Sequence, residues 1–453
     1  MATQISCVVM LLVALVLPWR FGKDFYSGLS CSVALLVSLP KHIQIAFGGL
    51  PALTIHRLIV VVVLFYWLKE RRNRSTWPKV PFSKLLWCIL LTQGVSMLCA
   101  EDFISSVKEF LYYALENLLY FALLATILRG QEDAVRLVRG MCVGLLGVAV
   151  LAFIEKYRGY SPMQYFPGYY EGTVMATFSH RILLGTAMAM GWPLCMLWAK
   201  TATSSNQRRV AWLAAVLCIG ACYFAQSRGP WIGMVLVGIV LVVLGSGKQR
   251  KRLIFLGLLA MAVCMTNRGV RETIVNRTGS TYDEGSEAQV SYQWRWELWH
   301  KAWSEISKSP VRLLLGYGPG ASESLNWEGE VVTMPEFATD TFSSWDNNWA
   351  AYLLECGLLG LSVLLCFYGV LSYHLLRICW RAEGSQRDYG ALIFATLMVF
   401  IFMQTNVQIF APQLYFLFWT TLAVGLALGR IPASDHVEEN LHDSELTLVC
   451  AAP

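Results

Sequence analysis

The sequence has few charged residues. Asp, Glu, Lys and Arg together make up 15% of its 453 residues, whereas hydrophobic residues make up 56% and the mean hydropathy is +0.50. Soluble globular domains usually carry about 25% charged residues. The composition therefore excludes an ordinary soluble domain, and the length exceeds that of a simple anchor. It predicts a polytopic membrane protein.

The sequence also lacks metal-binding and cleavage signals. Its 13 cysteines form no C-x-x-C pair and have no histidines at ligand spacing, so we interpret them as buried small hydrophobic residues and expect no metal and no cofactor. The first apolar run, 5–18, lacks a basic start and a small-residue cleavage site. We therefore expect this segment to stay in the protein rather than to be removed as a signal peptide. The net charge of +6 comes from short basic loops, so no nucleic-acid partner is expected.

Apolar runs of roughly 17 to 25 residues indicate membrane-spanning helices, and shorter runs are weaker candidates. The pattern predicts an all-α membrane protein with about 12 to 13 transmembrane helices. The candidate segments are 5–18, 27–39, 52–68, 83–99, 104–128, 135–154, 178–199, 209–226, 229–246, 252–266, 348–375, 388–408 and 412–430.

Basic residues mark every second loop as cytoplasmic, beginning with the loop that holds Lys69 and Arg71. The long loop 267–347 has 7 basic and 12 acidic residues, and its net charge of 7 − 12 = −5 favours the periplasmic side. We therefore expect N-terminal transmembrane helices in 1–266, a large periplasmic loop with helices in 267–347, further transmembrane helices in 348–430 and a disordered cytoplasmic tail in 431–453. The side of the N-terminus stays open.

Two outward-facing stretches precede the long loop. Segment 155–177 is dense in Tyr, Pro and Gly, which is typical of an interfacial belt or of a platform for sugar rings. His180 and Arg181 open the next span, either as a snorkelling pair or as a functional pair. Arg228, in SRGPW, is disfavoured on this side by the positive-inside rule. It is either structural or a ligand for an anion such as phosphate, which the following helix N-terminus would also favour.

The long loop contains the remaining candidates. The pattern of residues 289–307 predicts an amphipathic helix with Arg295 and Trp299 on one face. This helix either lies passively at the membrane surface or forms the wall of a pocket in which the guanidinium binds phosphate. Gly318 lies in a glycine-rich turn that permits close backbone approach but lacks the Lys and Ser/Thr of a P-loop. Asp346 and Asn347 are at the cap of the next helix, where the carboxylate of Asp346 could also serve as a general base.

The order of these motifs resembles the O-antigen ligase and polymerase superfamily. The resemblance rests on SRGPW, on R-x-x-x-W followed by LLGYGPG, and on DN-x-x with a closing E-x-G-x-x-G at Glu355 to Gly360, before the last spans of a many-span chain. Each motif alone is loose, and their combination is more specific. Arg228, Arg295 and Asn347 look like the corresponding residues of the family. Asp346, in contrast, stands where ligases characteristically have histidine. This variant is similar to polymerase-like branches.

The resemblance implies a GT-C-like fold and a glycosyltransferase in the bacterial inner membrane, with its active site facing the periplasm. The donor would be a polyprenyl-diphosphate-linked glycan and the acceptor a glycan or a lipid, with neither a metal nor a nucleotide sugar. Arg228 and Arg295 would hold the diphosphate, Asp346 would act on the acceptor hydroxyl, and the reaction would invert the anomeric carbon. Other polysaccharide-assembly proteins are further candidate partners.

Two alternatives remain. Within the same class, the enzyme could polymerise repeat units or ligate a finished glycan, as in exopolysaccharide or lipopolysaccharide assembly. Outside it, the chain could be a transporter or flippase without chemistry. The latter predicts a polar path through the whole bilayer, and the few ionisable residues within the predicted spans, such as Glu109 and Glu116, give it little support.

Overall fold

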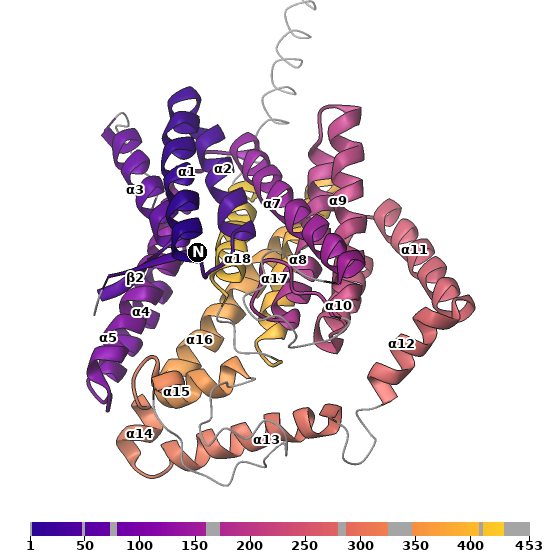
Figure 1. Cartoon of the computed structure of the whole chain (residues 1–453). Coiled ribbons are helices and arrows are strands. Elements are labelled where there is room, and N and C mark those ends of the chain that lie inside the picture. The colour runs from indigo at the N-terminus through magenta and orange to yellow at the C-terminus, as the bar shows by residue number, and fades with distance from the viewer. Residues whose placement is uncertain are drawn as a thin grey trace, which may run out of the picture.

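A computed structural model describes residues 2–47, 50–72, 79–159, 173–279, 287–324, 347–406 and 411–429. Helices dominate these ranges, and the long ones lie side by side in a bundle (Figure 1). The elements are α1 (Ala2–Lys23), α2 (Phe25–Ser38), β1 (Gln44–Phe47), β2 (Leu50–Thr54), α3 (Ile55–Arg72), α4 (Ser83–Met97), α5 (Phe103–Tyr112), η1 (Tyr113–Leu119), α6 (Tyr120–Ile127), α7 (Gln131–Arg158), α8 (Arg181–Thr201), α9 (Ser205–Phe224), α10 (Arg228–Leu244), α11 (Gly247–Thr266), α12 (Arg268–Gly279), α13 (Glu287–Ile306), α14 (Pro310–Leu315), α15 (Ala321–Ser324), α16 (Asn348–Arg381), α17 (Gly384–Met403) and α18 (Pro412–Leu428).

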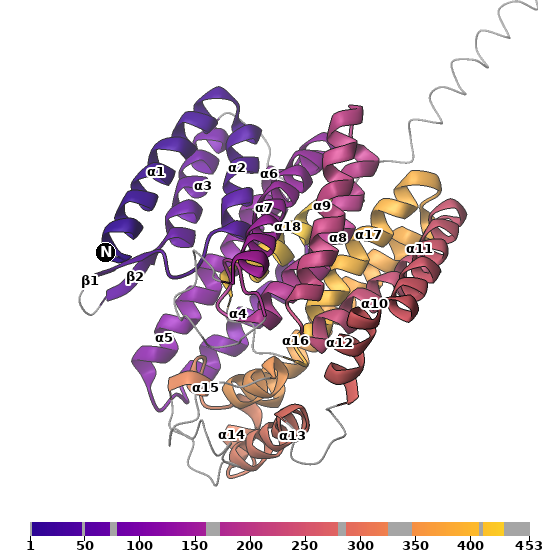
Figure 2. The ribbon, with the colours of Figure 1, turned by 45° about the vertical axis from the view of Figure 1, so that its right-hand side comes forward.

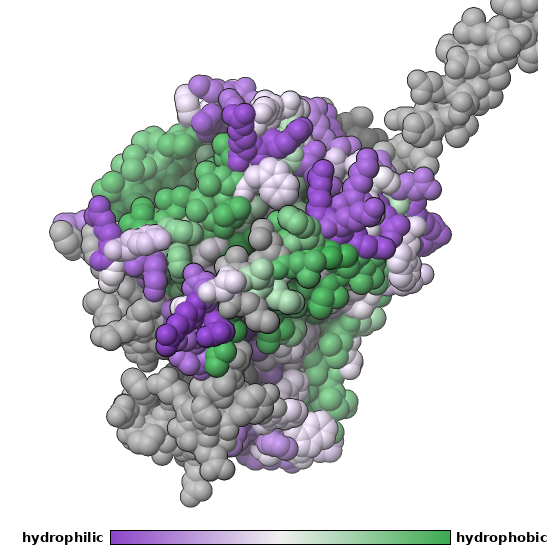
Figure 3. All heavy atoms as spheres, turned by 90° about the vertical axis from the view of Figure 1, so that its right-hand side faces the viewer, coloured by the Kyte–Doolittle hydropathy of each residue, from purple (hydrophilic) through white to green (hydrophobic). Residues whose placement is uncertain are grey.

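The predicted all-α membrane fold is confirmed. Each predicted apolar segment coincides with a helix or, for 104–128, with the continuous run α5, η1 and α6. Six helices of the described part are long and apolar enough to cross a membrane, and α2, α10 and α18 are shorter apolar helices. In the space-filling view, broad hydrophobic areas lie below hydrophilic side chains that gather towards the top and upper right (Figure 3).

Two local features were not predicted. The segment 52–68 begins as a strand, because β1 and β2 form an antiparallel hairpin and the helix begins only at Ile55. The helix at 104–128 contains the π-helical stretch η1, which buries Glu116. Arg57 of α3 donates a hydrogen bond to this carboxylate at 2.5 Å, so the acid is paired inside the bundle.

The centre of the bundle is formed by α8, whose residues 183–199 are all buried. It packs against α7, α9, α10 and α17, while α18 packs against α2, α7 and α17. The turned view shows α8, α17 and α18 among the helices that surround them (Figure 2). These central helices position the loop ends at which the predicted site residues lie.

The described parts of the large loop contain the helices α12 to α15. The predicted amphipathic helix at 289–307 is α13, which lies at one end of the bundle with α14 and α15 (Figure 2). Leu298, Ala302 and Ile306 are buried against the first turns of α16. The predicted tail 431–453 lies outside the described residues.

Candidate functional site

The end of α17 fixes the start of α16. The backbone N–H of Asn348 donates to the Gln404 carbonyl at 2.9 Å, and its side-chain amide donates to Gln404 Oε1 at 2.8 Å. Gln404 in turn donates through Nε2 to the Tyr368 hydroxyl at 2.7 Å and is 1% exposed. Three hydrogen bonds to one buried residue therefore hold the helix that follows the predicted Asp–Asn pair.

Asn347 is the N-cap of α16. Its Oδ1 accepts from the backbone N–H groups of Trp349 at 3.0 Å and Ala350 at 3.2 Å, and the residue is 4% exposed. The cap that the sequence predicts is therefore present at Asn347, because this oxygen satisfies two otherwise unpaired donors. Asp346, the predicted base, lies outside the described residues, immediately before this cap.

Arg228 is the first residue of α10, after a link of three residues from α9. The backbone reverses at Gln226, whose φ is 48°, and Arg228 is half-buried. A Cβ added to Gly229 would lie 3.2 Å from Met403 and 3.5 Å from Asn406, so α10 begins directly beside the end of α17. The starts of α10 and α16 thus meet at the same helix end.

His180 and Arg181 begin α8 at the same end of the bundle. His180 caps the helix by accepting from the Ile182 N–H at 3.1 Å. A Cβ on Gly185, one turn further, would lie 2.7 Å from Pro230 of α10, so the first turns of α8 and α10 are in contact. The predicted pair is therefore adjacent to the helix that Arg228 opens.

The start of α18 completes this end of the bundle. Gln413 Nε2 donates to the carbonyls of Leu39 at 2.9 Å and Thr177 at 3.4 Å, which joins α18 to the approach to α8. Four helices, α8, α10, α16 and α18, therefore begin here. Asn347 and His180 cap two of these helices, and the four N-termini together carry partial positive charge, which favours an anion.

Arg295 and Trp299 are on α13, which packs across the first turns of α16. Trp299 is half-buried and contacts the hydrophobic cores on both sides of it. Arg295 is one turn earlier on the same helix, and its side chain lies outside the described residues. Trp299 and its buried neighbours therefore pack against the first turns of α16, and the pocket wall with Arg295 stays a prediction.

Ion pairs fix the C-terminal end of α13. Glu305 is 3.0 Å from Lys301 and 2.5 Å from Lys308, and its backbone carbonyl accepts from the Tyr317 hydroxyl at 3.2 Å. Burial opposes ionisation of the Glu305 carboxyl, but the hydrogen bonds from the two lysines outweigh it and lower its pKa. Burial also raises the pKa of Tyr317, which keeps its hydroxyl available as a donor.

Gly318 lies away from the other predicted residues. Its N–H donates to the carbonyl of Glu355 at 2.9 Å, and a Cβ would lie 2.6 Å from Ala100 and 2.7 Å from the Ser106 hydroxyl. Glu355 is two turns beyond Asn347, or about 12 Å along the helix axis. The close packing with φ of 96° accounts for glycine here.

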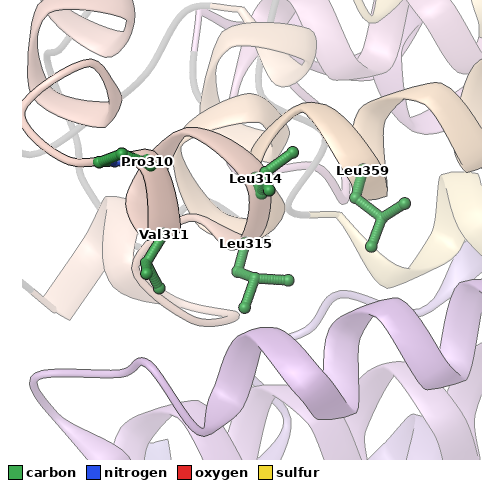
Figure 4. A pocket seen from close by; sticks show the side chains of 5 residues that line it. All are labelled: Pro310, Val311, Leu314, Leu315 and Leu359. Atoms are coloured by element: carbon green, nitrogen blue, oxygen red, sulfur yellow. The ribbon is translucent and has the colours of Figure 1, made fainter.

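A shallow apolar pocket of about 370 Å³ lies beside this turn, between α14 and α16. Figure 4 shows its lining side chains, which are Pro310, Val311, Leu314, Leu315 and Leu359. Within the described residues no group of three His, Cys, Asp or Glu side chains could hold a metal ion. The pocket offers hydrophobic contact and no charged group.

Sequence reasoning missed Gln404. The signal was available, because Gln404, Thr405 and Asn406 interrupt an apolar run at the membrane side that also holds Arg228. The run was interpreted only as the end of a span. The hydrogen bonds of Gln404 to Asn348 and the position of Asn406 beside Gly229 depend on helix packing that no local pattern encodes.

Comparisons with known proteins bear on the same region. Residues 213–365 match the sequence model of a family described as O-Antigen ligase. The chain is also similar to an O-antigen ligase of Salmonella typhimurium (strain LT2), with 21% identity over 377 residues that cover 78% of this chain and 86% of the relative. The matched segment runs from α9 into α16 and contains Arg228, Arg295 and the Asp346–Asn347 pair. The resemblance to the O-antigen ligases that the motifs of this chain indicate is therefore confirmed over residues 213–365.

Proposed function

We propose that this protein is a glycosyltransferase that uses a polyprenyl-diphosphate-linked glycan as donor at the periplasmic face of the bacterial inner membrane. The O-antigen ligase match supports a ligase or polymerase role in glycan assembly. The acceptor is a glycan or a lipid, and both polymerisation and ligation fit the site. The reaction inverts the anomeric carbon and uses no metal.

One observation carries the proposal. The starts of α10 and α16 meet at the end of α17, through Gly229 beside Asn406 and Asn348 bonded to Gln404. This arrangement brings the start of α10, which Arg228 opens, close to the start of α16, and Asp346 directly precedes the N-cap residue of α16 in the sequence. A cation for the donor and a base for the acceptor would then be available at one place.

The chemistry follows from these groups. Arg228, Arg295, Arg181 and His180 would bind the diphosphate and stabilise the negative charge that grows on it as the glycosidic carbon–oxygen bond breaks. Asp346 would accept the proton of the acceptor hydroxyl, whose oxygen forms the new bond from the opposite face of the sugar. The polyprenyl diphosphate leaves. A carboxyl with an ordinary pKa near 4 is ionised at neutral pH and can accept this proton.

The surroundings fit a lipid-linked donor. Exposed apolar side chains of α14 and α16, including Val311 and Leu359, line the pocket in Figure 4 and would contact part of the prenyl chain. Basic residues such as Lys200 and Arg208 lie at the other end of the bundle, after α8 has crossed it. By the positive-inside rule this supports a periplasmic position for the site.

The proposal predicts a large loss of activity on removal of the charged groups. Asp346→Asn, Arg228→Ala and Arg295→Ala should each reduce glycan transfer in reconstituted membranes by about 100-fold or more, because a general base or a charge clamp typically contributes at least that much. Arg208→Ala, an exposed arginine at the opposite end, is the matched control and should keep wild-type activity.

The same variants, expressed in cells, separate polymerisation from ligation. In cells, loss of a polymerase leaves single repeat units on the lipid carrier, whereas loss of a ligase leaves finished polymer there, and the two are distinguished by glycan length on a gel. Glycan made at the wild-type level by correctly inserted Asp346→Asn protein would contradict the role of this residue as base.

A further inference from the structure

A charged cavity lies at the opposite end of the bundle from the candidate site. This pocket, of about 430 Å³, lies between the end of α1, the first turns of α2 and the first turns of α7. Arg20, Arg136 and Arg139 line it, and Asp24 is the single acidic residue among its lining side chains. The three helices lie next to each other in Figure 1. The site described above makes no use of this cavity.

Close helix packing builds the floor of the cavity. A Cβ added to Gly140 would lie 2.4 Å from the Ser30 carbonyl oxygen, and the Ser30 hydroxyl donates to the Arg136 carbonyl at 2.9 Å. Cys31, Ala34 and Val143 line the side of the cavity that continues towards the membrane interior. The cavity therefore has a cationic rim and an apolar lower wall.

The three arginines of the cavity differ in whether a carboxylate pairs with them. Arg136 is 2.6 Å from Glu132 and 3.5 Å from Asp24, so carboxylates already neutralise it. Arg20 and Arg139 are exposed, and no carboxylate among the described residues pairs with either. Asp24 is also used elsewhere, because it caps α2 by accepting from the Ser27 N–H at 2.9 Å. Two guanidinium groups thus remain to bind an anion.

The edge of the cavity resembles a membrane interface. Trp19 is exposed, Lys23 lies 3.9 Å from its ring centroid, and Arg20 lies 5.0 Å from the same ring. Trp and basic residues at helix ends are typical of the headgroup region of a bilayer. Below them, α1 presents the exposed apolar side chains of Leu12 and Leu15 to the lipid.

We propose that this cavity binds the phosphate of an anionic phospholipid headgroup, with an acyl chain against the apolar wall at Val143. A guanidinium binds a phosphate with two parallel hydrogen bonds, and basic pockets between helices on the cytoplasmic side suit anionic headgroups. Orientation in the membrane requires positive charge alone and does not require a cavity. The apolar wall distinguishes a lipid from free phosphate, which has no chain to bury.

The test uses the full chain in nanodiscs of phosphatidylcholine to which phosphatidylglycerol is added. The anionic lipid should raise the melting temperature of the wild type, and native mass spectrometry should show it retained. In the double variant Arg20→Gln/Arg139→Gln the apparent affinity for this lipid should fall about 25-fold, at roughly a factor of five for each basic residue near the surface. Arg208→Gln/Arg209→Gln removes two exposed arginines from the same end without touching the cavity and should behave like the wild type.

Three results would overturn the proposal. The first is unchanged lipid retention in Arg20→Gln/Arg139→Gln, and the second is an equal loss in the control pair, which would indicate general surface attraction. The third is the same stabilisation by millimolar inorganic phosphate in pure phosphatidylcholine, which would assign the cavity to a soluble anion. The proposal is independent of the glycosyltransferase reaction, because none of these measurements depends on activity.

Discussion

At the scale of single residues, Gln404 shows how one buried amide can hold the start of a neighbouring helix in place. Its side-chain oxygen and its backbone carbonyl accept hydrogen bonds from Asn348 at the start of α16, and its side-chain nitrogen donates to Tyr368 in the same helix. Asp346 is two positions before Asn348. A displacement of the start of α16 would therefore move the proposed base relative to Arg228.

Gln404→Leu tests this positioning role. The variant removes both side-chain hydrogen bonds, and we expect at least a tenfold loss of kcat with little change in KM, because misplacement of about 1 Å can reduce a rate 100-fold. Thr396→Val is the matched control, since it removes a buried polar group from the middle of α17. Equal losses in the two variants would indicate a purely structural role for Gln404.

At the scale of elements, the kink in α16 joins the large loop to the bundle. Gly357 has φ 61° and ψ −168°, and a Cβ there would lie 2.4 Å from the carbonyl of Leu314 in α14. Beside it, the N–H groups of Tyr317 and Gly318 donate to the carbonyls of Leu354 and Glu355 at 3.0 and 2.9 Å. Because the helix breaks at Gly357, these two carbonyls accept hydrogen bonds from the loop instead of from the next turn of α16.

Gly357→Ala should loosen this junction. We expect a cost of about 1 to 3 kcal/mol, because the backbone conformation is accessible essentially to glycine alone and the methyl group would contact Leu314. The check is faster hydrogen exchange in α14 and a lower melting temperature. Gly369→Ala in the same helix has no atom within 4 Å of the added Cβ and should be neutral or slightly stabilising. Equal behaviour of the two variants would contradict the explanation.

At the scale of the whole molecule, Asp388 ties the helices together at the end opposite the candidate site. Its carboxylate lies 2.7 Å from Lys200 Nζ at the end of α8 and accepts from Ser246, between α10 and α11, through the backbone at 2.7 Å and the hydroxyl at 3.0 Å. The residue is 4% exposed. One acid therefore connects three parts of the bundle.

Asp388→Leu should destabilise the protein by about 3 to 5 kcal/mol, because it leaves Lys200 and the Ser246 N–H without their partner in a buried place. The melting temperature in detergent should fall, while glycan transfer per folded molecule stays near the wild-type value. Glu383→Ala, at an exposed acid five positions earlier, is the control and should cause little change. A melting temperature equal to that of the wild type would show that the contacts of Asp388 contribute nothing.

The sequence predicts the helical fold well and the site only in part. Apolar runs locate the helices, including α10 after its short link, because each span must satisfy its backbone hydrogen bonds internally. The glycine and cap patterns likewise anticipate the turn at Gly318 and the cap at Asn347. What local pattern cannot encode is which helix ends meet, and for that reason Gln404 and the pairing of Arg57 with Glu116 were found only in the structure.

The π-helical stretch at Tyr113–Leu119 has a consequence for how this chain tolerates length changes. A π-helical turn closes on the fifth residue along rather than the fourth, so it holds one more residue than the α-helical turn that it replaces. Deleting a single position between Tyr112 and Tyr120 would remove this extra residue and leave a uniform α-helix, while the helix that follows would keep nearly its present orientation. The shortened helix would still be long enough to cross the membrane. Glu116 lies within this stretch, so the direction of its carboxylate towards Arg57 depends on the wide turn.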